Sequence, residues 1–256
     1  MEYQSILFTI GFFAFCGGLI DAAVGGGGLV QLPALMHAFP KHSLATVFRT
    51  NKIIAITDTV SSALAFFNNV TINWKLIIPT MLAAFIFSFF GAMSVSLIPK
   101  ELMRYIVFFL LIIIAIYTFA KKDLGQIHTV LQTGKKEIAI GIFFGAVIGF
   151  YDGIFGPGTG SFLLFLFVKV FAFDFLNASA SAKLVNVATN IAAMFFFIPT
   201  GHVIWTAAVI LAVCNILGAM TGTALALRYG SGFIRIFFLF LLVFLIGRMG
   251  YDLFIH

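Results

Sequence analysis

Charged side chains are scarce in this chain of 256 residues. Only 9% of its residues are Asp, Glu, Lys or Arg, whereas 62% are apolar. A soluble domain usually carries about 25% charged and about 45–50% apolar residues, so this chain has too few polar side chains to cover a surface in water. The composition excludes a secreted domain, a nucleic-acid-binding module and a cytosolic enzyme, and it places the chain in a lipid bilayer.

Cysteine and the common catalytic motifs are also scarce or missing. The two cysteines, Cys16 and Cys214, lie far apart in apolar segments and form neither a CxxC pair nor a disulfide framework. No nucleophile elbow, HExxH motif or Walker A loop occurs, and the five histidines lack the spacing of metal ligands. We therefore expect no enzyme, no metal and no cofactor. The net charge of +6 indicates no nucleic-acid partner, because the basic residues are scattered between apolar runs.

Long apolar segments fill most of the chain. They fall at about 4–24, 29–39, 44–67, 74–98, 102–120, 138–154, 161–173, 178–198, 203–227 and 233–255. A membrane-spanning helix needs about 20 mostly apolar residues, whereas a β-barrel would need alternating polarity. The sequence therefore predicts an all-α polytopic membrane protein. Its one aqueous loop, 121–136, divides the chain into a first membrane repeat at 1–120 and a second at 137–256.

Residues of the first half recur in the second half in the same order, which indicates an internal duplication. The matched pairs are Asp21 and Asp152, Gly25 and Gly156, Gly27 and Gly158, Trp74 and Trp205, and Arg104 and Arg235 at an offset of 131 residues, Gly91 and Gly218 at 127, and Asn51 and Asn186 at 135. We expect two homologous halves related by a pseudo-two-fold axis, each a broken or re-entrant helix followed by three transmembrane helices.

The relative orientation of the two halves depends on the broken helix. If it turns back as a hairpin, each half crosses the membrane three times and the repeats are inverted. If it passes through, each half crosses four times and the repeats are parallel. Both arrangements place the two termini on the same side of the membrane.

Runs of glycine break the first apolar segment of each half, as GGGG in one and GPGTG in the other. Each glycine costs a helix about 1 kcal/mol relative to Ala, and unwound backbone at membrane depth is tolerated only where it is buried or lines a cavity. Such paired interruptions indicate a transporter's binding site, and a helix that starts there offers free N–H groups to an anion. Close helix packing at the glycines is the alternative. The candidate binding residues are Gly25, Gly26, Gly27, Gly28, Gly156, Gly158, Thr159, Gly160 and Ser161.

Charged and amide side chains inside apolar segments extend this candidate site. A charge at the bilayer centre costs about 2.5–3.5 kcal/mol, so such residues face the protein interior or water. Arg49 and Lys52 have a second interpretation, in which they reach back to the membrane surface. The residues of this kind that we expect to bind substrate are Arg49, Asn51, Lys52, Lys183, Asn186 and Asn190.

Three buried carboxyl groups are candidates for coupling or gating. Asp21 and Asp152 lie four residues before the two glycine runs, and Asp58 lies within the apolar segment 44–67. A carboxylate close to an anion repels it unless a proton neutralises the carboxylate, which would couple protons to the substrate. The alternatives are an ion pair with a neighbouring Arg or Lys, or a cap on the broken helix.

The glycine segments resemble the two signature segments of the sulfite exporter TauE/SafE family. The similarity lies in Gly18-Leu-Ile-Asp21 running into GGGG and Leu32-Pro33, and in the stretch from Gly149 to Phe162, and it extends over essentially the whole chain. The resemblance implies a permease of duplicated architecture that moves small sulfur-containing anions, such as sulfite or sulfonates, mostly outward.

Together these observations predict a secondary permease of the cell membrane that works by alternating access. Its partners would be a small anion and the lipid bilayer, with protons as a candidate coupling ion and no nucleic acid. Two alternatives stay open: a non-transporting scaffold or assembly protein, and an anion channel.

Overall fold

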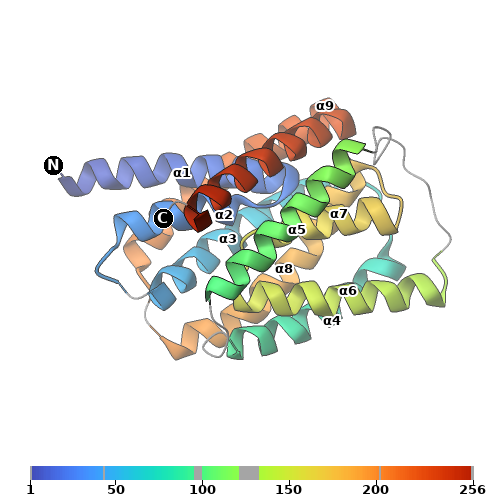
Figure 1. The fold of residues 1–256 in the computed structure, drawn as a ribbon, viewed down its shortest axis with the longest axis horizontal. Coiled ribbons are helices and arrows are strands. Elements are labelled where there is room, and N and C mark those ends of the chain that lie inside the picture. Colours follow the sequence, from blue (N-terminus) through green and yellow to red (C-terminus); the bar gives the residue numbers. More distant parts are fainter. Residues whose placement is uncertain (1, 43, 95–99, 121–132, 202, 255–256) are drawn as a thin grey trace.

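The computed structural model describes residues 2–42, 44–94, 100–120, 133–201 and 203–254, and in these ranges all regular structure is helical. Most of the linker expected at 121–136 lies outside the described residues. The helices are α1 (Glu2–Val24), α2 (Gly27–Ala38), α3 (Leu44–Phe67), α4 (Trp74–Met93), α5 (Lys100–Ala120), α6 (Lys135–Ile154), α7 (Thr159–Val170), α8 (Phe175–Thr200) and α9 (Trp205–Phe254) (Figure 1).

Four stretches of the described residues are long and apolar enough to cross a membrane: α4, α6, Phe175–Pro199 of α8 and Trp205–Phe244 of α9. Shorter apolar helices cover Phe8–Val24 and α7. The long helices turn large apolar side chains such as Phe143 and Val209 outward, where lipid rather than water can cover them. The chain is therefore a polytopic membrane protein, as its composition predicts. Helix α9 bends sharply at Gly230, where φ is 68°.

Glycine lets α4 pack directly on α6 and α1 directly on α9. A methyl group added at Gly149 of α6 would lie 2.7 Å from Ala84 Cα, and one added at Gly222 of α9 would lie 3.0 Å from Leu19 Cα. Lipid offers no hydrophobic drive for helix association, so such close backbone contact supplies much of the packing energy. Helices α4 and α6 run side by side along the lower edge of Figure 1.

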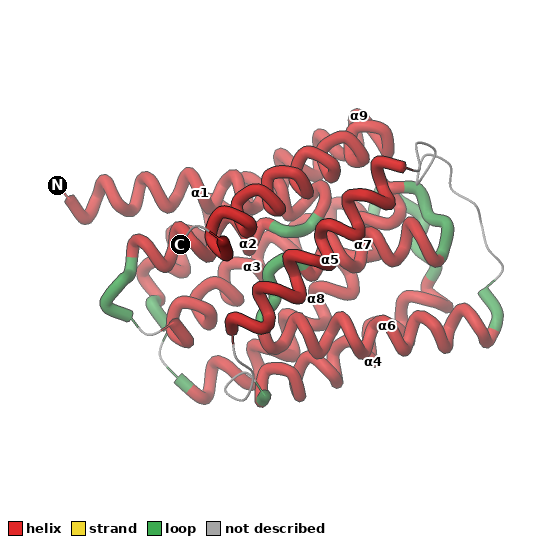
Figure 2. The backbone as a smooth tube through the Cα atoms, viewed as in Figure 1, coloured by secondary structure: helices red, strands yellow, loops and turns green. Residues whose placement is uncertain are grey.

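Each of the two glycine runs interrupts a helix, and each interruption is a hairpin. Helix α2 returns along α1. The hydrogen bond that Gln31 Nε2 of α2 donates to the Ala14 carbonyl of α1, at 3.3 Å, joins the two helices. Helix α7 returns along α6, where the rings of Tyr151 and Phe162 lie 5.3 Å apart between centroids. Both breaks are short loops inside the helical bundle (Figure 2).

The two hairpins are held by different chemistry. Gln31 also donates to Asn215 Oδ1 of α9, and Asn215 Nδ2 donates to the Ile54 carbonyl of α3 at 3.1 Å. The second hairpin is held by Ser161 of α7, whose hydroxyl bonds to the end of α1, and by the aromatic contact of Tyr151 with Phe162. The first hairpin is thus tied to α3 and α9 by amide hydrogen bonds.

The hairpins enter the bundle from opposite directions. In Figure 1, α1 runs from the left toward the centre and α6 runs from the right toward the centre. Helix α1 begins and α9 ends toward the left of the same view. Helices α3 and α8 lie between the hairpins and carry most of the buried polar side chains.

The glycine contacts predict a steric effect on stability. We expect Gly149→Ala to lower the free energy of unfolding in detergent by about 1–3 kcal/mol, because the new methyl group meets the α4 backbone. Gly232→Ala is the matched control, since nothing lies within 4 Å of a methyl group there. Equal unfolding midpoints for the two variants would contradict the packing described for α4 and α6.

Candidate functional site

Left-handed glycine residues form both helix breaks. Gly25 and Gly26 have φ of 70° and 112°, and Gly156 and Gly158 have φ of 85° and 91°. Only glycine reaches these conformations without a steric penalty from Cβ. Gly26 precedes the first turn of α2 and Gly158 precedes the first turn of α7.

The two breaks touch each other in the protein interior. A methyl group at Gly160 would lie 2.6 Å from Gly25 Cα, and one at Gly25 would overlap the Gly160 backbone. Ser161 Oγ donates to the Gly25 carbonyl at 2.7 Å and to the Val24 carbonyl at 3.2 Å. The positive ends of α2 and α7 therefore lie in one place.

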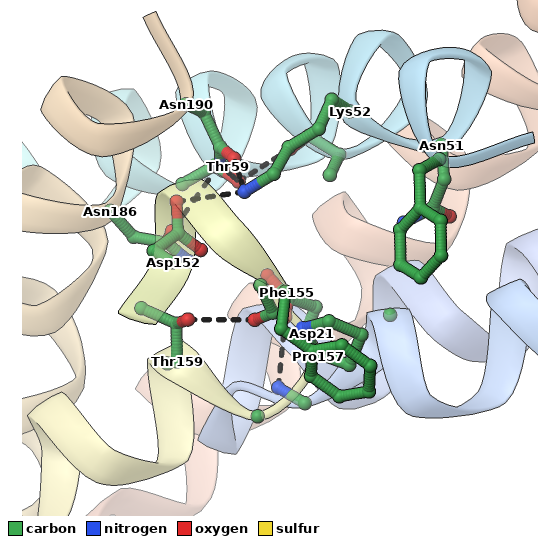
Figure 3. A pocket seen from close by; sticks show the side chains of 17 residues that line it. Asp21, Asn51, Lys52, Thr59, Asp152, Phe155, Pro157, Thr159, Asn186 and Asn190 are labelled. Atoms are coloured by element: carbon green, nitrogen blue, oxygen red, sulfur yellow. Dashed lines mark hydrogen bonds and ion pairs between the residues drawn. The ribbon is translucent and has the colours of Figure 1, made fainter. Parts of the chain in front are cut away.

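A small polar cavity of about 40 Å³ lies beside the meeting point of the two breaks. A buried water needs roughly 10–15 Å³ on the same measure, so the cavity has room for only a few atoms. Figure 3 shows its walls. The predicted site residues that line it are Asp21, Gly26, Gly28, Asn51, Lys52, Asp152, Gly156, Gly158, Thr159, Gly160, Asn186 and Asn190.

Two buried ion pairs join the helices around this cavity. Lys52 Nζ of α3 lies 2.7 Å from Asp152 Oδ2 of α6 and also donates to Asn190 Oδ1 at 3.1 Å. Lys183 Nζ of α8 pairs with Asp21 Oδ2 of α1. Both lysines are buried, so Lys52 does not reach back to the membrane surface. A buried charge without its partner costs several kcal/mol, so these pairs fix how the four helices assemble.

Asp21 organises the first break with both of its oxygens. Its Oδ1 accepts hydrogen bonds from the backbone N–H groups of Gly26 at 3.0 Å and Gly27 at 3.1 Å, while Oδ2 faces Lys183. Asp21 is therefore both an ion-pair partner and a helix cap. At the second break Thr159 Oγ1 donates to the Gly156 carbonyl at 2.7 Å, which ties the loop together without accepting from an N–H group of α7.

Several polar groups at the cavity have no partner. None of the described hydrogen bonds uses the backbone N–H of Gly28 or of Gly160, and Asn51 Oδ1 is buried without a donor. The amides of Asn186 and Asn190 bond to each other at 3.3 Å, and Asn190 Nδ2 also reaches Thr59 Oγ1 at 3.4 Å. Because buried polar groups are normally paired, these open positions suit a polar guest.

The structure leaves other predicted residues outside the cavity wall. The helix breaks themselves contain Gly25, Gly27 and Ser161. Lys183 pairs with Asp21 without lining the cavity, and Asp58 lies near both of these charged groups. Arg49 packs against Gly201, the residue at the end of α8. Substrate contact by Arg49 stays a prediction. No group of three His, Cys, Asp or Glu side chains in the described ranges is placed like metal ligands.

Sequence reasoning missed five residues of the wall: Phe48, Ala55, Thr59, Phe155 and Pro157. For Thr59 a signal was available. The offset of 131 residues that joins Asp21 to Asp152 also joins Lys52 to Lys183 and Thr59 to Asn190. The aromatic wall residues carried no such signal, since phenylalanine is abundant in the whole chain.

The Lys52–Asp152 pair predicts strong coupling between two substitutions. We expect Lys52→Met to destabilise the protein by about 3–5 kcal/mol, because it leaves the Asp152 carboxylate buried without a cation. Adding Asp152→Asn should restore most of that loss. A double-mutant cycle of unfolding free energies in detergent measures the effect, and additive losses would refute the pairing.

Comparison with known proteins places this geometry in a family. The model of the family "Sulfite exporter TauE/SafE" matches residues 10–249. "Probable membrane transporter protein YfcA" of Escherichia coli K12 is 32% identical over 96% of this chain and 90% of its own length. "Probable membrane transporter protein ORF9" of a Sinorhizobium species is 32% identical over 87% of this chain and 84% of its own.

A "Probable membrane transporter protein" of Haemophilus influenzae is 30% identical over 98% of this chain and 96% of its own length. No solved structure matches the chain. With the family model covering most of the chain, and relatives similar over nearly their whole lengths, this chain belongs to the TauE/SafE family of membrane transporters, which is a transporter family and not an enzyme family.

Proposed function

We propose that this chain is a secondary permease that exports small sulfur-containing anions, such as sulfite or organosulfonates, by alternating access. One observation carries the proposal: two helices begin at a shared, buried polar cavity with backbone N–H groups for which the described residues supply no acceptor. The first N–H groups of a helix and its dipole bind anions without a formal cation. Gly28 on α2 and Gly160 on α7 would supply these donors.

Charges at the cavity support an anion as the guest. Lys52 lines the wall and is held by Asp152 and Asn190, so an entering anion could draw its ammonium group away from the carboxylate. The amide Nδ2 groups of Asn51 and Asn186 would add neutral donors for its oxygens. The site thus combines a movable cation with fixed donors, which suits temporary rather than permanent binding.

The size of the cavity supports the smallest member of the proposed substrate class. About 40 Å³ has room for only a few water-sized groups, so a compact anion suits it better than an extended one. A sulfonate with a carbon chain needs more room, and Phe48, Phe155 and Pro157 stand in its way. The sulfur itself is inferred from the family, whose name is that of a sulfite exporter.

We also propose that residues 1–120 and 137–256 are homologous halves joined by the linker 121–136. Alternating access would then be a movement of one half relative to the other. Each ion pair joins the two halves, and the partners of one pair stand 131 residues from those of the other. The glycines of the helix contacts fit the same offset, since Gly91 meets Phe150 and Gly222 meets Leu19. This correspondence replaces Gly218 by Gly222 as the equivalent of Gly91.

Two hairpins that enter from opposite directions support inverted halves, each with three crossings, and both termini on one side of the membrane. Movement of one half against the other would break and remake the two ion pairs around the bound anion. The cavity could then open to one side at a time.

Flux measurements on the purified protein in proteoliposomes test the proposal. We expect saturable uptake of sulfite and stabilisation of the detergent-solubilised protein by about 2.7 kcal/mol at one hundred times the dissociation constant. Sulfate, thiosulfate, sulfoacetate and taurine complete the ligand panel. Electrical conductance without saturation would indicate a channel, and no response to any anion would favour a scaffold protein.

Gly28→Ala tests the site itself. A methyl group there would lie 3.6 Å from Pro157 Cα and 3.7 Å from Asn51 Nδ2, which are ordinary contacts, so the fold should be kept. The methyl group would occupy the cavity and cover the donor N–H. We expect sulfite affinity to fall about tenfold or more, because a hydrogen bond to a charged group contributes about 1.5–3 kcal/mol.

Gly232→Ala, which adds the same methyl group in open space on α9, is the control for this substitution. Unchanged affinity in the Gly28 variant would place the substrate elsewhere.

A further inference from the structure

Asp58 is a carboxyl group that the proposed binding site does not use. It lies on α3, only 1% of its surface is exposed, and the charged groups that face it are Asp21 of α1 and Lys183 of α8. The hydrogen bond described for it comes from the hydroxyl of its neighbour Thr59, at 3.3 Å. No described ion pair supplies Asp58 with a cation of its own.

The ammonium group of Lys183 is already committed to another carboxylate. One carboxylate oxygen of Asp21 pairs with Lys183, and the other accepts hydrogen bonds from two backbone N–H groups. Lys52 and Asp152 balance each other on the far side of the cavity. With every group ionised, the five buried side chains carry three negative charges and two positive charges, which leaves one negative charge without compensation.

An anion that enters the cavity beside these five side chains adds a second uncompensated negative charge. Uncompensated charge at membrane depth is expensive, so the cluster can accept an anion readily only if it loses negative charge at the same time. Two neighbouring carboxyl groups that share a proton are the common solution. Asp58 has the weaker set of donors in its pair with Asp21, so a proton that enters the cluster goes to Asp58.

A path for the proton is visible on α3. Thr59 connects Asp58 to the cavity, because its hydroxyl lines the wall and accepts from Asn190. One turn further along the helix, on the same face as Asp58, Ser62 is fully buried and its Oγ has no partner. An unpaired buried hydroxyl one turn from Asp58 is available to bond to its carboxyl group when that group changes protonation.

We propose that Asp58 takes up one proton with each anion that enters the cavity, so that the permease carries anion and proton together. The inference rests on the proposed function. The proton passes from water to the Asp58 carboxylate as the anion binds and returns to water as it leaves. A doubly charged sulfite ion accompanied by one proton moves a single negative charge, and an inside-negative membrane potential then drives it outward.

The pH dependence of sulfite binding to purified protein tests this assignment. For the native chain, affinity should fall about tenfold for each pH unit once Asp58 is ionised in the empty protein. Asp58→Asn should bind sulfite with an affinity that no longer has this slope, and it should still exchange sulfite across proteoliposomes. A proton gradient should no longer drive sulfite accumulation by this variant.

The comparison is made between variants at equal sulfite concentration and pH, so that protonation of sulfite in solution cancels. Asp174→Asn is the matched control, because Asp174 is a buried carboxylate that caps α8 outside the cavity. It should keep the native slope. A native slope in Asp58→Asn, or dependence on sodium instead of pH, would overturn the inference.

A measurement on the native chain covers the case in which Asp58→Asn does not fold. Infrared difference spectra should show a protonated-carboxyl band that appears when sulfite is added and shifts in heavy water. Sulfite binding without this band and without a pH slope would overturn the inference while leaving the proposed function intact. Absence of sulfite binding at every pH would remove both.

Discussion

The contact between Gly25 and Gly160 is the constraint on which the rest of the structure depends. Two helices end at membrane depth, where no water can satisfy their free backbone groups. Each break is tolerated because the other covers it, with Ser161 donating to the carbonyl groups that end α1. Gly28 and Gly160, whose N–H groups no described hydrogen bond uses, line a common cavity. The same contact therefore stabilises the fold and creates the site.

The sequence predicted the local features of this arrangement well. Glycine runs break helices for reasons of backbone entropy, so the ends of α1 and α6 could be placed from GGGG and GPGTG alone. The pairing of Lys52 with Asp152 could not be placed in this way, because it joins residues 100 positions apart and depends on how α3 meets α6. Arg49 illustrates the same limit: helix position gave its face, but only tertiary packing places it against Gly201.

The buried charged residues around the cavity balance one another in pairs. Asp21, Lys52, Asp152 and Lys183 form two neutral pairs that tie α1 to α8 and α3 to α6. Each pair is strong enough to hold the helices and close enough to the cavity to respond to a charged guest. Structural and functional roles of these side chains are therefore not separable, and substitutions among them should be interpreted with unfolding data at hand.

The different attachment of the two hairpins has a consequence for the working cycle. Displacing α2 means breaking the amide hydrogen bonds of Gln31 and Asn215 that tie it to α3 and α9, whereas displacing α7 means breaking the hydrogen bonds of Ser161 at its first turn and shifting aromatic rings. Two hairpins of matching shape are thus unequal in stiffness. We therefore expect the two hairpins to resist displacement to different degrees, so that the two sides of the cavity are not mechanically equivalent.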